Sequence, residues 1–190
     1  MTYRSSFSQH NTFCQCQYYW YLSSIKKLEI ISDMCYANAG DVVHKCLEFF
    51  YKNKSSIEEV KNMFEIKWKE KKLDQSIIKH KFSEYWIMIL NGINLNINLT
   101  STELKIYYPD IIAYLDMVNT TEDIISDWKT STRSEENEKE YKRQLTLYSW
   151  IYYRHFGVIL DRHKALESGN RLACFVKFIL ENSQARKNKK

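Results

Sequence analysis

Two aspartates and a lysine near the middle of the chain could together hold a divalent metal ion. Asp116 lies in an apolar run, and Asp127 and Lys129 lie at the end of the next apolar run, with the polar stretch NTTED between the two. Two runs of strand type around a polar break predict a β-hairpin. Carboxylate oxygens are preferred ligands of hard divalent cations. The sequence therefore points to a metal site on this hairpin.

The register of the hairpin decides whether the three side chains meet. If residues 120–123 form the loop, Asn119 faces Ile124, and Asp116 comes to lie directly opposite Asp127. Directly opposed residues hold their Cβ atoms about 5 Å apart. Lys129 points to the same face as Asp127 because strand side chains alternate. The competing interpretation is a solvated hairpin face whose charged residues serve no chemistry.

The composition favours a single globular domain that acts on a polyanion. The chain has 190 residues, 15% of them aromatic, and a net charge of +5 with a basic end at residues 183–190. We expect no membrane span and no signal peptide. The five cysteines are odd in number and irregularly spaced, which is typical of reduced thiols in a cytoplasmic protein.

The elements that must position this hairpin divide into a helical half, residues 1–91, and a mixed sheet, residues 92–182. Capping and apolar spacing predict helices over 5–24, 38–52, 55–72 and from Asp74 to 91–92. Strict alternation predicts a strand over 93–99, a turn over 100–103 and a second strand over 104–108. A long helix over 135–156 and a buried strand over 171–180 follow, and the crossover predicts that this strand is parallel to the one before the helix. The fold class expected is α+β.

Four short motifs occur in order on these elements. They are Gly40-x-x-x-His44 on a helix, Ala113-x-x-Asp116 and Asp127-x-Lys129 on strands, and Gln144-x-x-x-Tyr148 on the long helix. In this order the chain resembles the RecB-like branch of the PD-(D/E)XK nucleases, including CRISPR-adaptation and AddB-type nuclease domains. That branch has a restriction-endonuclease-like core of helix, three-stranded antiparallel meander, crossover helix and strand. Ala113 replaces the glycine that the branch carries in its second motif.

The resemblance implies a role for each matched residue. His44, Asp116, Asp127 and the carbonyl of Trp128 would be metal ligands. Lys129, with Asp116 and Asp127, would be catalytic, and Gln144 and Tyr148 would hold the DNA backbone and position Lys129. Read without the resemblance, Gln144 and Tyr148 are ordinary surface and core residues of a helix.

The resemblance also implies the activity. It suggests a single nuclease domain over 1–190 that hydrolyses DNA with Mg²⁺ or Mn²⁺, single-stranded DNA more readily than duplex. The resemblance implies DNA as a partner. It also allows two kinds of protein partner: a second copy of the chain, or proteins of recombination or CRISPR systems. The alternative is a catalytically silent nucleic-acid-binding scaffold of the same fold. Some relatives hold an iron–sulfur cluster with three clustered C-terminal cysteines, but this chain has only Cys174 there, so we expect no cluster.

Overall fold

The computed structural model describes residues 4–28, 34–95, 101–121, 124–130, 135–157, 160–167 and 176–182. These residues form an α+β fold with a helical N-terminal half, a three-stranded antiparallel meander inside a larger sheet, and a long helix after the meander. The fold class and the restriction-endonuclease-like order of elements expected from the sequence are confirmed.

The described residues of the N-terminal half form five α-helices. They are α1 (Phe7–Gln15), α2 (Gln17–Trp20), α3 (Cys35–Asn53), α4 (Ile57–Glu70) and α5 (Phe82–Asn94). A π-helical turn (Tyr21–Ile25) follows α2, and two 3₁₀ turns (Leu73–Gln75 and Lys79–Lys81) precede α5. The helix expected from Asp74 therefore begins later, at Phe82.

Capping boxes start two of these helices where the sequence indicated. At α1, the Ser6 hydroxyl accepts from the Gln9 amide, and Gln9 Oε1 accepts from the Ser6 amide at 3.0 Å. Ser56 and Glu59 make the same pair at α4. Each pair satisfies two backbone N–H groups that the helix itself leaves unbonded. The single helix expected over 5–24 is instead broken at Cys16, whose backbone is extended.

The described strands form one six-stranded sheet. Its members are β1 (Ser5–Ser6), β2 (Ser101–Tyr108), β3 (Ile111–Asn119), β4 (Ile124–Asp127), β5 (Leu160–Glu167) and β6 (Val176–Asn182). The order is β1-β3-β4-β6-β5, and β2 also pairs with β3. β1 is parallel to β3, and all the other pairs are antiparallel.

Two expectations about strands were wrong. Ile93 and Asn94 end helix α5, and Ser101–Glu103 belong to β2 and not to a turn. Residues 96–99 of the expected strand and Thr100 of the expected turn lie outside the described residues. Two strands follow the long helix, first β5 and then β6. The expected strand corresponds to β6, which is antiparallel to β4 and not parallel to it. The additional strand β5 is antiparallel to β6. The strand that runs in the same direction as β4 is thus β5, and β6 lies between them.

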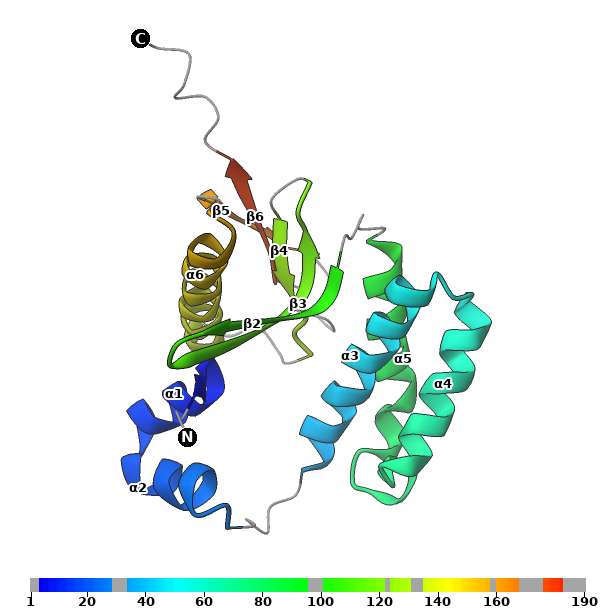
Figure 1. Cartoon of the computed structure of the whole chain (residues 1–190). Helices are drawn as coiled ribbons and strands as arrows, with labels where there is room; N and C mark the ends of the chain where they lie inside the picture. The colour runs from blue at the N-terminus through cyan, green and yellow to red at the C-terminus, as the bar shows by residue number, and fades with distance from the viewer. Residues whose placement is uncertain are drawn as a thin grey trace.

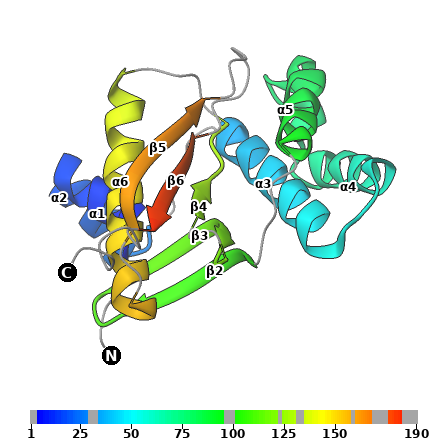
Figure 2. The same cartoon turned by 90° about the horizontal axis from the view of Figure 1, so that it is seen from above.

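Helices cover both faces of the meander. Helix α6 (Glu135–Phe156) lies on one side of the sheet, whereas α3, α4 and α5 form a body on the other side (Figures 1 and 2). Ala113, Leu115 and Ile125 pack with α6, and Met117 and Trp128 pack with the helical body. The β3–β4 hairpin therefore packs against two hydrophobic cores, one on each side of the sheet. Within the described residues, no helix is long and apolar enough to cross a membrane.

Candidate active site

The β3–β4 register is the one that the sequence predicted. Asn119 pairs with Ile124, Val118 with Ile125 and Met117 with Ser126. One further step along the same register sets Asp116 opposite Asp127. The Asp116 Oδ2 atom accepts a hydrogen bond from the Trp128 amide at 2.7 Å, which ties the two strand ends together at this point.

A third carboxylate, Glu103 on β2, joins the two aspartates. Thr102 pairs with Met117 and Leu104 with Leu115, so Glu103 lies across from Asp116. Its backbone is left-handed, with φ 52°, which is uncommon for a residue with a Cβ. Three neighbouring strands thus each contribute one acidic residue at the same level of the sheet.

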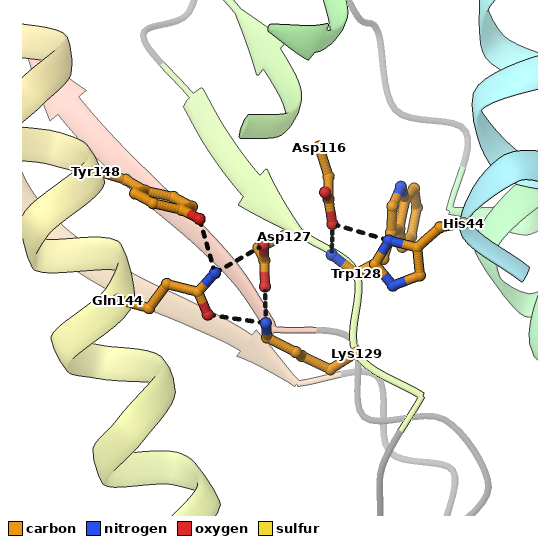
Figure 3. Close-up of polar contacts among 7 residues, drawn as sticks. All are labelled: His44, Asp116, Asp127, Trp128, Lys129, Gln144 and Tyr148. Atoms are coloured by element: carbon orange, nitrogen blue, oxygen red, sulfur yellow. Dashed lines mark hydrogen bonds and ion pairs between the residues drawn. The ribbon is translucent and has the colours of Figure 1, made fainter. Parts of the chain in front are cut away.

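His44 approaches the same point from α3, on the helical side (Figure 3). Its Nδ1 atom lies 3.3 Å from Asp116 Oδ2. One turn earlier, a Cβ added to Gly40 would lie 2.8 Å from Thr130 Oγ1, a distance that real Cβ atoms essentially never show. The glycine therefore permits the close approach of α3 to the segment after β4, and this approach brings His44 to Asp116.

Lys129 is held by a network that begins on β4 and ends on α6 (Figure 3). Its ammonium forms an ion pair with Asp127 and donates to Gln144 Oε1 at 2.8 Å. Gln144 Nε2 donates to the Tyr148 hydroxyl at 3.0 Å and to Asp127 Oδ1 at 3.4 Å. The Lys129 ammonium also lies 4.9 Å from the centre of the Tyr141 ring. Three groups, Asp127, Gln144 and Tyr141, therefore hold the Lys129 ammonium beside the carboxylates.

Burial and mutual repulsion change the protonation of these groups. Burial, and then the charge of Asp116, raise the pKa of Asp127 to about 6. Burial opposes protonation of His44, but its hydrogen bond to Asp116 and the nearby carboxylate charges outweigh burial and raise its pKa. For Lys129 burial is likewise outweighed by Asp127, so its pKa is raised and it stays charged at neutral pH. Burial and the charges of Asp116 and Glu48 raise the pKa of Glu103.

Three of these side chains are arranged as ligands of one divalent ion. His44, Glu103 and Asp116 each offer one ligand atom, and these atoms all lie within 4.8 Å of one another. Because hard cations bind oxygen at about 2.0–2.6 Å, ligands on opposite sides of an ion are about 4–5 Å apart. The spacing and the mixed imidazole and carboxylate chemistry fit a divalent metal.

The metal group is reachable from solvent. An open groove of about 440 Å³ runs between α3 and the sheet and is lined by residues that include Tyr36, Gly40, His44, Glu48, Glu103 and Thr130. Of the three ligand side chains, His44 and Glu103 line this groove and are open to it.

The structure brings together every site residue that the sequence indicated. The contacts form two neighbouring sets: His44 and the Trp128 amide contact Asp116, and Asp127, Lys129, Gln144 and Tyr148 contact one another. The two sets meet along the chain, because Trp128 lies between Asp127 and Lys129. Sequence reasoning missed Glu103, because it placed this residue in a turn. One signal in the sequence could have found it. A tight hairpin at Pro109-Asp110 would pair the residues on its two sides, and this pairing places Glu103 opposite Asp116.

Ala113 and the cysteines have other surroundings. Ala113 is fully buried in the core that includes Leu145 and Tyr148 of α6. Cys14 and Cys16 are exposed, Cys35 and Cys46 are buried, and none of these four described cysteines forms a disulfide. Cys174 lies outside the described residues, so the expectation of a cluster-free protein awaits iron analysis of the purified protein.

Comparison with known proteins gives one match. The family model of the PD-(D/E)XK nuclease superfamily matches residues 4–177. No curated protein and no solved structure matches the chain. The matched region contains all the residues of the site described above.

Proposed function

Because the chain belongs to the PD-(D/E)XK nuclease superfamily, we propose that it is a divalent-metal-dependent DNA nuclease that hydrolyses phosphodiester bonds. Nucleases of this superfamily are generally metal-dependent hydrolases. The observation that carries the proposal is the alignment of Glu103, Asp116 and Asp127 on three adjacent strands, with His44 on one side and Lys129 on the other. A solvated hairpin face would not bury Asp127 or surround a lysine with three partners.

The metal would be held by His44, Glu103 and Asp116, with Asp127 and the carbonyl of Trp128 completing its protein ligands. The proposal for His44, Glu103 and Asp116 is supported by the short distances among their ligand atoms. When bound, a divalent ion lowers the pKa of its water and neutralises charge on a phosphate. The Trp128 amide holds Asp116 Oδ2 in place, which is how outer hydrogen bonds commonly orient metal ligands.

Lys129 would be the catalytic cation that faces the phosphate. Its charge would stabilise the negative charge that develops on the phosphate oxygens during hydrolysis. Gln144 would be a positioning residue, since it accepts from the ammonium and donates to Asp127. Tyr148 is buried and would act through Gln144, whose amide group it orients.

The finer features of the proposal follow from the RecB-like motif order. We place the chain in that branch because Gly40 and His44 precede the meander and Gln144 and Tyr148 follow it. Single-stranded DNA would be the preferred substrate, in a cytoplasmic protein that works with a second copy of itself or with recombination or CRISPR-type proteins. Mn²⁺ would serve at least as well as Mg²⁺, because Mg²⁺ prefers an all-oxygen shell and His44 supplies nitrogen.

A digestion experiment separates this proposal from the silent-scaffold alternative. Supercoiled plasmid and circular single-stranded DNA are incubated with the wild type, Asp116→Asn and Lys61→Gln, an exposed control on α4, with Mg²⁺, Mn²⁺ or EDTA. We expect cleavage by the wild type and the control with metal alone, and none by Asp116→Asn. Binding without cleavage under every condition would establish the scaffold instead. Cleavage that persists in EDTA would refute the metal mechanism.

A further inference from the structure

The exposed face of the β2–β3 hairpin carries cations and tyrosines that the active site does not use. Strand alternation sets these side chains on the face opposite Ile106 and Ala113, which are buried against α6. We name this group the β2–β3 cationic patch; it consists of Arg4, Lys105, Tyr107 and Tyr114.

The two cations of the patch are held by aromatic rings. The Lys105 ammonium lies 5.2 Å from the centre of the Tyr107 ring and 5.1 Å from that of Tyr114. The Arg4 guanidinium lies 5.1 Å from the Tyr107 ring, and its Nε donates to the Pro109 carbonyl at 3.3 Å. Within the described part of the chain, neither cation forms an ion pair with a carboxylate.

The chemistry of the patch suits a phosphate group. Tyr107 is 50% exposed and Tyr114 is 41% exposed, so both phenols are open to solvent. Hydrogen bonds with these two hydroxyls raise the pKa of Lys105, which stays charged. Each hydroxyl that accepts from the ammonium can still donate its own proton. The patch therefore offers donors and positive charge, the combination with which proteins bind nucleic-acid backbones.

The patch continues from the active site along β2. Lys105 lies two residues after Glu103, and Tyr107 lies four residues after it. These separations correspond to about 7 and 13 Å along a strand. A strand of nucleic acid bound at Glu103 and Asp116 can therefore reach the patch with a neighbouring part of its backbone. The carboxylates of the active site repel a phosphate when no cation neutralises their charge. A positively charged surface beside them would offset this repulsion and favour binding of the backbone.

We propose that the β2–β3 cationic patch binds the phosphodiester backbone of the nucleic-acid substrate, a few nucleotides away from the cleaved bond. This inference rests on the proposed nuclease function. It adds a second point of substrate contact, on a different element from the catalytic lysine. Because the patch reads phosphate and not base edges, its contribution is independent of sequence and sensitive to salt.

The test measures DNA affinity against salt concentration. A labelled single-stranded oligonucleotide is titrated in EDTA with the wild type, Arg4→Gln, Lys105→Gln, the double variant and Lys61→Gln. Each lost phosphate contact should reduce the slope of log K against log salt by about 0.7, and the double variant by about 1.4. Lys61→Gln lies on α4, on the helical body away from β2, and should match the wild type (Figures 1 and 2). Tyr107→Phe and Tyr114→Phe should weaken binding without changing the slope, because they remove donors and no charge.

Two further measurements separate this inference from the proposed function. The double variant should bind Mn²⁺ like the wild type and should cleave a dinucleotide, whose single phosphate is the one cleaved, at the wild-type rate. If the wild type binds and cleaves DNA but the double variant keeps its affinity and slope, the patch is not a DNA contact, and the nuclease proposal stands. A wild type that neither binds nor cleaves DNA would overturn both.

Discussion

Gly40 on α3 and Thr130 after β4 approach each other so closely that a Cβ at position 40 would lie 2.8 Å from Thr130 Oγ1. Thr130 follows Lys129 directly, and His44 lies one helical turn after Gly40. This single contact therefore sets the distance between the histidine and the strand that carries Asp127 and Lys129. The glycine of the first motif has a steric purpose and no chemical one.

Gly40→Ala should weaken metal binding, although alanine favours a helix more than glycine does. Of the two other rotamers of Thr130, one moves its methyl group into the space that the oxygen leaves, so only the rotamer that turns its Cβ hydrogen there avoids the clash, and β-branched side chains are restricted at χ1. His44 should then be displaced and the affinity for Mn²⁺ should fall by about 10–100-fold, as for other losses of ligand orientation. Titration calorimetry measures this fall. The double variant Gly40→Ala, Thr130→Ala should regain the affinity, and full affinity in Gly40→Ala alone would refute the steric account.

Gln144→Ala should lower the cleavage rate and leave metal binding nearly intact. Gln144 contacts Lys129, Asp127 and Tyr148 but is not among the residues grouped around the metal position. Losing it frees the Lys129 ammonium to move, so kcat should fall by about tenfold or more while the Mn²⁺ affinity stays within about twofold. Tyr148→Phe, which removes only one hydroxyl, should show a smaller loss. A Gln144→Ala protein that no longer binds Mn²⁺ would contradict this division of roles.

The sequence predicted the hairpin best, because its signal was local. Four residues, 120–123, separate the paired residues Asn119 and Ile124, and loop length fixes the register that joins Asp116 to Asp127. The cap at Ser6 and the capping box at Ser56 were also local signals, and both are confirmed. The order of the motifs then placed Gln144 and Tyr148 on the right helix.

Sequence-based prediction failed where tertiary contacts determine the local structure. Ile93 alternates with polar neighbours as a strand residue would, yet it is buried in the core of the helical body and continues α5. Strand β5, LDRHKALE, lacks an apolar alternation, so nothing local marks it. Without β5, the crossover appeared to lead directly to β6. Glu103 was missed because the polar residues 100–103 predict a turn, and only the pairing of β2 with β3 makes residues 101–103 part of a strand.

The affinity for Mn²⁺ should fall in mildly acidic solution. Asp127 has a pKa raised to about 6, so about one tenth of the molecules carry an ionised Asp127 at pH 5. His44 also has a raised pKa and must lose its proton to bind metal, which acts in the same direction. Dissociation constants for Mn²⁺ measured between pH 5 and 7.5 should therefore rise by about tenfold or more at the acidic end.

Asp127→Asn should remove part of this pH dependence, because one of the titrating groups is gone. The remaining dependence belongs to His44 and to Glu103, whose pKa values are also raised. An affinity that stays constant from pH 7.5 to pH 5 in the wild type would show that none of these residues exchanges a proton for the metal.

Asp127→Ala and Lys129→Ala should change the DNA affinity in opposite directions, or only one of them should lower it, when binding is measured without metal. Asp127 adds negative charge where a phosphate docks, so removing it should leave DNA affinity unchanged or improved in EDTA. Lys129→Ala removes an attractive charge and should bind DNA more weakly, with a loss that shrinks as salt rises. Gel-shift titrations at two salt concentrations measure both effects. Weaker DNA binding by Asp127→Ala, with normal binding by Lys129→Ala, would show that Asp127 does not face the phosphate.

The most direct test of the account is calorimetric titration of Mn²⁺ into the wild type, Asp116→Asn, Glu103→Gln and Glu58→Gln. Glu58 is an exposed acidic residue in the first turn of α4 and serves as the matched control. We predict that Asp116→Asn abolishes binding, that Glu103→Gln weakens it by about tenfold or more, and that Glu58→Gln binds like the wild type. Thermal unfolding confirms that each variant is folded. Wild-type affinity in folded Asp116→Asn and Glu103→Gln would contradict a metal site built from adjacent strands.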